Sequence, residues 1–82
     1  MRISWQRGAL DDVKSCVPKQ FRKPLRDFLS GLYYVGQGAP SNDPRYPEAR
    51  YIKFQYWIVV YFAISDRHIG VLAVYYDYGQ PR

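Results

Sequence analysis

Cysteine and histidine are almost missing from this chain, and their scarcity excludes several classes of protein. Cys16 is the single cysteine and His68 the single histidine among 82 residues. A lone cysteine cannot form an intramolecular disulfide, whereas secreted domains of this size usually carry several. No spacing of His, Cys, Asp or Glu matches a metal site. We therefore expect a disulfide-free domain that holds no metal ion and no cofactor.

Long hydrophobic runs are also missing. The longest, residues 56–64, is nine residues long, whereas a membrane-spanning helix needs about 20 apolar residues. The first residues lead quickly to Asp11 and Asp12, which does not fit a signal peptide. Gly36 and Gly38 lack the lysine and the following helix of a phosphate-binding loop. These absences predict a cytoplasmic protein with no membrane partner.

The chain is instead rich in aromatic and basic residues. Aromatic side chains make up 18% of it, nine of them tyrosine, and the net charge is +5 with a pI near 9.5. This composition suits one compact α+β domain over residues 1–82. Its charge attracts polyanions, so nucleic acid, a ribosome or an acidic protein would fit as partners. Many small domains are basic without binding nucleic acid, so the charge identifies a class of partner and no particular one.

The first half of the chain predicts a strand followed by two helices. Residues 2–6 alternate between apolar and polar side chains, as in a half-buried strand. Two apolar stripes at helical spacing follow, one formed by Leu10, Val13 and Val17 and the other by Phe21, Leu25, Phe28, Leu29 and Leu32. Pro24 leaves two interpretations of the second stripe, a helix that begins near Lys23 or a longer one that bends. We expect this helix to end near Tyr34.

The second half predicts a loop and then a sheet. Residues 36–44 have the composition of a loop. Residues 49–54, 56–64 and 69–78 read as strands, and the polar residues 65–68 form a turn between the last two. A turn near Gln55 has no glycine or Asn-Gly signal. The predicted fold is α+β, with an N-terminal strand, a two-helix hairpin and a three-stranded antiparallel sheet.

At this point the chain resembles the RelE/ParE superfamily of bacterial toxins from toxin–antitoxin modules. The segments that carry the resemblance are residues 1–13, read as a strand running into a helix through Ala9-Leu10 and acidic residues, residues 50–54 and 57–61 as the central strands, and residues 69–79 as the closing strand. In the family the closing strand ends in glycine followed by basic residues, and here the ending is Tyr78-Gly79-Gln80-Pro81-Arg82. The resemblance implies a two-helix layer on a twisted antiparallel sheet and a cognate antitoxin that masks the working surface.

The resemblance also implies one of two activities. RelE-like members are ribosome-dependent messenger RNA endonucleases, and ParE-like members inhibit DNA gyrase. For the nuclease, the matching positions are Lys53 on the first central strand, Arg82 after the closing glycine and Tyr78 as catalytic residues. Arg50, Tyr75 and Tyr76 would then contact the nucleic acid or other target, the tyrosines by stacking on bases.

Several positions depart from the nuclease pattern, so enzymatic activity stays open. The family nucleases often carry an arginine where this chain has Tyr56 or Trp57. Lys53 also fits the solvent side of a half-buried strand, and the tyrosines fit ordinary cross-strand packing. The ribosome and gyrase therefore both remain candidate targets. The alternative is a noncatalytic module that binds nucleic acid or protein.

Overall fold

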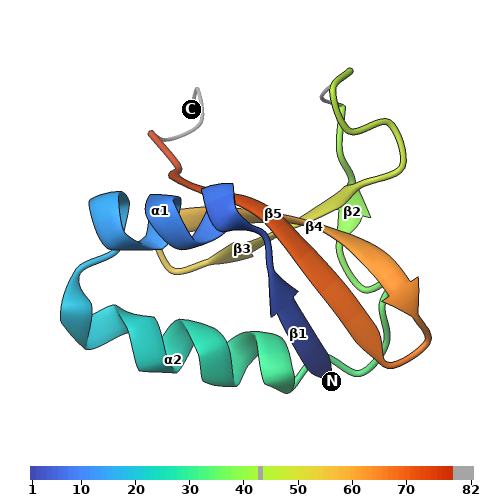
Figure 1. The fold of residues 1–82 in the computed structure, drawn as a ribbon, viewed down its shortest axis with the longest axis horizontal. Coiled ribbons are helices and arrows are strands. Elements are labelled where there is room, and N and C mark those ends of the chain that lie inside the picture. The colour runs from blue at the N-terminus through green and yellow to red at the C-terminus, as the bar shows by residue number, and fades with distance from the viewer. Residues whose placement is uncertain (43, 79–82) are drawn as a thin grey trace.

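The computed structural model describes residues 1–42 and 44–78. The elements are, in chain order, β1 (Arg2–Trp5), α1 (Arg7–Cys16), α2 (Lys19–Ser30), β2 (Ala39–Pro40), β3 (Arg50–Phe54), β4 (Trp57–Ser65) and β5 (His68–Tyr76) (Figure 1). The predicted α+β class and the order of strand, helices and sheet are confirmed. The three predicted strands do pair antiparallel as β3, β4 and β5, but the prediction of a three-stranded sheet is wrong in its strand number, because the sheet has five strands and includes a parallel pair.

All the strands form one mixed sheet in the order β1-β5-β4-β3-β2. β1 pairs with β5 in parallel, with Ile3 opposite Ile69, and every other pair is antiparallel. The local alternation of residues 2–6 predicts a strand but carries no information about its partner, which lies more than sixty residues away. β2 has only two residues, one of them Pro40, inside the segment that composition assigned to a loop.

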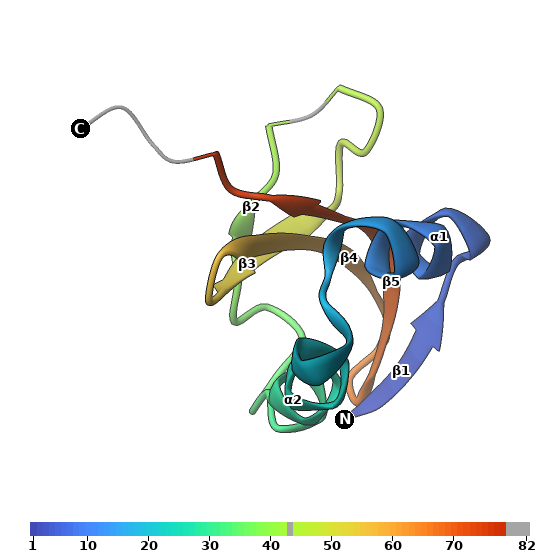
Figure 2. The ribbon, with the colours of Figure 1, turned by 90° about the vertical axis from the view of Figure 1, so that its left-hand side faces the viewer.

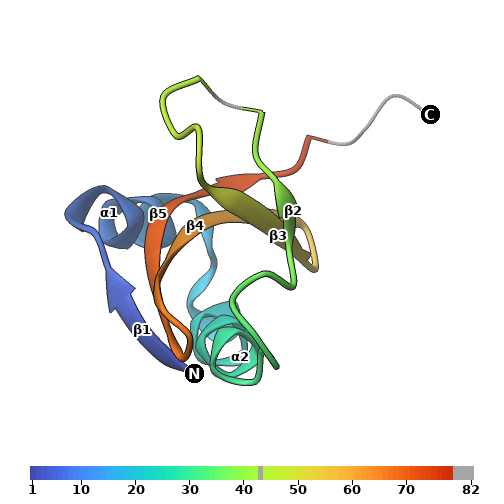
Figure 3. The same cartoon turned by 90° about the vertical axis from the view of Figure 1, so that its right-hand side faces the viewer.

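The two faces of the sheet have different surroundings. Trp57, Val59 and Tyr61 point from β4 into the hydrophobic core beneath the helices, so the intervening Ile58, Val60 and Phe62 belong to the opposite face. Figures 2 and 3 show α2 on one side of the sheet and the loop between β2 and β3 projecting to the other. We call the face turned away from the helices the open face.

α1 protects an edge that β1 leaves uncovered. β1 pairs with β5 only as far as Val71, and α1 follows directly beyond that point. There the Val74 N–H donates to the Asp12 carboxylate at 3.0 Å, and the Cys16 thiol donates to the Val74 carbonyl at 3.6 Å. These side chains take the place of a neighbouring strand along this part of β5. They thereby protect an edge that could otherwise pair with another chain.

α2 runs through Pro24 as one helix from Lys19 to Ser30, which agrees with the longer of the two predicted helices. It ends four residues before Tyr34, where the Gly31 N–H donates to carbonyls of the last turn. Arg22 stabilises the preceding helix, since its guanidinium donates to the carbonyls of Val17 and Lys14 at 3.0 and 3.2 Å. These are carbonyls at the C-terminal end of α1, which a cation complements.

The turn between β3 and β4 uses a strained residue. Phe54 pairs with Trp57, so Gln55 and Tyr56 alone connect the strands. Gln55 has φ of 55°, in the left-handed region that glycine and asparagine adopt more easily. The structure therefore confirms the turn expected near Gln55, although the Gln55 side chain gives no signal for this type of turn.

Candidate functional site

A shallow depression of about 460 Å³ lies on the open face of the sheet. Three neighbouring side chains on β3, β4 and β5 form a row across it, in which Lys53 lies opposite Ile58 and Ile58 lies opposite Tyr75. The full lining consists of Ser41, Asn42, Tyr51, Lys53, Ile58, Tyr75 and Asp77. Two residues predicted for the site, Lys53 and Tyr75, therefore share one depression. An apolar floor between tyrosine rings and one cation can hold a flat polar group.

The positive charge of Lys53 is already matched by a carboxylate. Its ammonium lies 2.9 Å from Asp77 Oδ2, and the Lys53 side chain is 56% exposed whereas that of Asp77 is only 4% exposed. The Asp77 backbone N–H donates to the Tyr56 carbonyl at 2.7 Å, which fixes the start of the segment after β5. Lys53 is the one cation among the described residues that line the depression. The site is thus close to neutral where a phosphate would enter.

The two partners of this ion pair are expected to respond differently to substitution. Lys53→Met removes the cation from a buried carboxylate, and we expect it to lower the free energy of unfolding by about 1–2 kcal/mol, a value reduced because water screens the exposed end of the pair. Asp77→Asn leaves the Lys53 ammonium exposed to water, which solvates it, and should cost less than Lys53→Met. Urea unfolding of both variants measures the difference.

The double variant tests whether the two effects arise from one interaction. Lys53→Met with Asp77→Asn removes both charges, so it should be more stable than the sum of the two single losses predicts. Strict additivity in the double variant would show that the pair does not stabilise the fold, and equal losses in the single variants would show that the burial of Asp77 does not set the cost.

Arg50 lies on the other side of the sheet from Lys53. It is opposite the buried Tyr61 in the register of β3 and β4, and its guanidinium donates to the Gly38 carbonyl at 2.8 Å. This bond holds the segment before β2 against the helix-facing side of the sheet. The structure therefore does not bring Arg50 together with Lys53.

The other predicted tyrosines form a rim at the end of the sheet. Tyr76 lies between two exposed rings, with centroids 6.4 Å from Tyr56 and 5.0 Å from Tyr78, and it contacts the edge of Trp57 at 6.3 Å. The Tyr78 ring is 89% exposed. We call Tyr56, Tyr76 and Tyr78 the tyrosine rim. Its rings are available for stacking, but none of the three lines the depression.

Sequence reasoning did not find Asp77 or Tyr51, which line the depression beside Lys53. Tyr51 could have been found, because its position two residues before Lys53 places both side chains on one face of a strand. Asp77 follows the last strand, and its pairing with Lys53 depends on the register across three strands. Arg82, the remaining predicted catalytic residue, lies outside the described residues.

The single cysteine and the single histidine both contact other parts of the fold. Burial, with a smaller contribution from the Asp12 carboxylate, raises the pKa of the Cys16 thiol, so little reactive thiolate forms at neutral pH. His68 Nε2 lies 2.7 Å from the Ser4 hydroxyl and links β5 to β1. Within residues 1–42 and 44–78, no three His, Cys, Asp or Glu side chains are grouped so that they could hold a metal ion.

Comparison with known proteins gives no match to a family model, to a curated protein or to a solved structure. In the described part of the chain, neither helix has the length and apolar character needed to cross a membrane.

Proposed function

We propose that this protein is the toxin of a toxin–antitoxin module and that it arrests growth by binding its target, in the manner of the ParE-like inhibitors of DNA gyrase. The toxin class rests on the resemblance of residues 1–13, 50–54, 57–61 and 69–79 to the RelE/ParE superfamily. It is supported by the order of strand, helices and sheet and by the basic charge of the chain. In this proposal a cognate antitoxin neutralises the protein, which acts in the cytoplasm.

The geometry of Lys53 is the observation that favours binding over hydrolysis. Cleavage of RNA by its own 2′-hydroxyl requires cations aimed at the developing phosphorane charge. Lys53 is paired with the buried Asp77 at 2.9 Å, and Arg50 donates to Gly38 on the opposite side of the sheet. An ammonium matched by a carboxylate contributes less to a phosphate than an unmatched one does.

Messenger cleavage on the ribosome remains the second candidate, because Lys53 and Tyr75 line the same depression. A base stacked on Tyr75 would place its phosphate near the Lys53 ammonium. Under this alternative, Lys53→Ala should reduce cleavage by about 10- to 1000-fold through loss of transition-state stabilisation.

Two assays with the purified protein separate the candidates. We expect the protein to inhibit supercoiling by DNA gyrase and to leave messenger RNA intact in a cell-free translation reaction, read by primer extension. New 5′ ends at ribosome-occupied codons, lost in Lys53→Ala, would replace the proposal with the nuclease.

Growth measurements test the toxin class itself. Expression alone should arrest a bacterial host, and co-expression of a small neighbouring gene should restore growth. Because the proposed action needs no cation to stabilise a transition state, Lys53→Ala should weaken growth arrest far less than the loss of a catalytic residue would. Normal growth with a folded, well-expressed protein would reject the toxin class and leave a noncatalytic binding module.

A further inference from the structure

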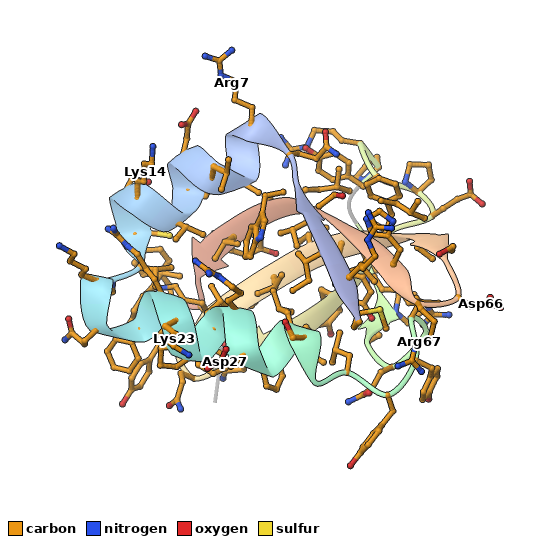
Figure 4. The ribbon with its side chains drawn as sticks, turned by 60° about the horizontal axis from the view of Figure 1, so that its bottom comes forward. Arg7, Lys14, Lys23, Asp27, Asp66 and Arg67 are labelled. Atoms are coloured by element: carbon orange, nitrogen blue, oxygen red, sulfur yellow. The ribbon has the colours of Figure 1, made fainter. Side chains whose placement is uncertain are left out.

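A second hollow, of about 480 Å³, lies on the helical side of the molecule between α1, α2 and the end of β1. Figure 4 views this side from outside, with both helices in front of the sheet and Lys14 on α1. Its lining consists of Trp5, Leu10, Val13, Lys14, Arg22, Leu25 and Arg26. We call it the helical groove.

The floor of the helical groove is apolar and partly accessible. Leu10 and Val13 lie one turn apart on α1, Leu25 faces them from α2, and Trp5 closes the end at β1. Leu10 is 44% exposed, although an adjacent residue on the same helix, Ala9, is fully buried. Apolar side chains that remain accessible in a concave site gain free energy when a partner covers them.

The rim of the helical groove is cationic. Lys14, Arg22 and Arg26 line it, and no carboxylate does so among the described residues. Arg22 is held in place by its bonds to the carbonyls of Val17 and Lys14. Residues 1–30 contain seven Lys or Arg against three Asp, so they carry four of the five net positive charges of the chain. The nearest acidic residue on α2, Asp27, is paired with Lys23 at 3.1 Å (Figure 4).

We propose that the helical groove binds a short amphipathic helix of a partner protein, with two apolar side chains one turn apart and Glu or Asp beside them. The apolar residues would cover Leu10, Val13 and Trp5, and the carboxylates would meet Lys14 and Arg26. Nucleic acid fits less well, because its charged backbone would leave the apolar floor uncovered. The proposal is independent of the toxin activity and of the depression on the open face.

A designed peptide serves as the probe. It is a capped 16-residue helix with Leu at two positions four apart and Glu beside them, and the control peptide has Lys in place of every Glu. We expect the Glu peptide to bind the full chain with Kd of about 100 µM or tighter and the Lys peptide to bind at least about 10-fold more weakly. In a ¹⁵N spectrum the Trp5 indole signal should shift, while that of Trp57, which donates to the Cys16 carbonyl at 2.9 Å, should not.

Three variants locate the site. Arg26→Glu should weaken binding of the Glu peptide about 10-fold, whereas Lys19→Glu makes the same change of charge on α2 outside the lining and should have less than about a 3-fold effect. Leu10→Ser removes apolar surface without changing charge and should also weaken binding. Circular dichroism verifies that each exposed substitution leaves the fold intact.

Other outcomes would overturn the proposal. Equal effects of Arg26→Glu and Lys19→Glu would mean that the peptide responds only to net charge. Equal binding of the Glu and Lys peptides, absence of binding at about 1 mM, or displacement of the Glu peptide from Trp5 by a single-stranded oligonucleotide would each reject an acidic helix as the occupant.

Discussion

Replacing Leu29 with alanine is expected to lower the free energy of unfolding by about 3 kcal/mol. Leu29 is fully buried and joins α2 to the sheet in the hydrophobic core. The substitution removes buried methyl groups and leaves a cavity that the surrounding side chains fill only in part. Since small domains are stable by only about 5 kcal/mol, most of the folding free energy would be lost. Thermal denaturation followed by circular dichroism should show a decrease in Tm of roughly 12–24 °C.

Lys23→Ala is the matched control for this prediction. Lys23 belongs to the same helix and its side chain is 81% exposed, with only a solvent-exposed pair to Asp27. Both substitutions introduce alanine into α2, so helix propensity is nearly the same, and the control should change stability by less than about 0.5 kcal/mol. A loss below about 1 kcal/mol in Leu29→Ala would contradict the packing of α2 onto the sheet.

The sequence was sufficient to predict the helices and the long strands, because burial on one side imposes a period. Leu25 and Leu29 lie one turn apart on α2, and both are buried. Val59 and Tyr61 are two residues apart on β4 and point into the same core. Solvent and core lie on opposite sides of these elements, so the pattern of side chains reports the local structure directly.

Strand pairing could not be predicted in the same way. The parallel partner of β1 is chosen by contacts between residues far apart in the chain, such as Ile3 with Ile69. Backbone bonds determine the hairpin at Gln55, whose positive φ is maintained by the pairing of Phe54 with Trp57. In both places tertiary structure overrides a weak local preference.

The candidate site was predictable only to the extent that it depends on single strands. Lys53 and Tyr75 were named because the resemblance to the RelE/ParE superfamily implied roles for them on two recognisable strands, and the sheet places them in one depression. The partner of Lys53 was not found, because Asp77 reaches it only through the register of β3, β4 and β5. This ion pair lowers the net charge of the depression, which residue types alone did not reveal.

Tyr61→Phe is expected to cost about 2 kcal/mol even though it removes a single oxygen atom. Tyr61 is fully buried, and its hydroxyl donates to the Val35 carbonyl and accepts from the Gly38 N–H, both at 2.9 Å. Phenylalanine would leave these two backbone groups without their partner in a partly buried place, and such groups are costly. Urea unfolding measures the loss, and Tyr51→Phe, on the exposed open face, is the control that should change stability by less than about 0.5 kcal/mol.

The same substitution should loosen the depression on the open face. Gly38 is packed so closely against Tyr51 and Tyr61 that a side chain would not fit there, and it precedes β2 and the lining residues Ser41 and Asn42. Tyr61 thus holds one end of residues 38–42 from inside the core, and the other end of this segment lines the depression. Hydrogen exchange should therefore accelerate at Gly38 and Ser41 in Tyr61→Phe but not in Tyr51→Phe. Unchanged exchange at both amides would show that the depression is positioned by the pairing of β2 with β3 alone.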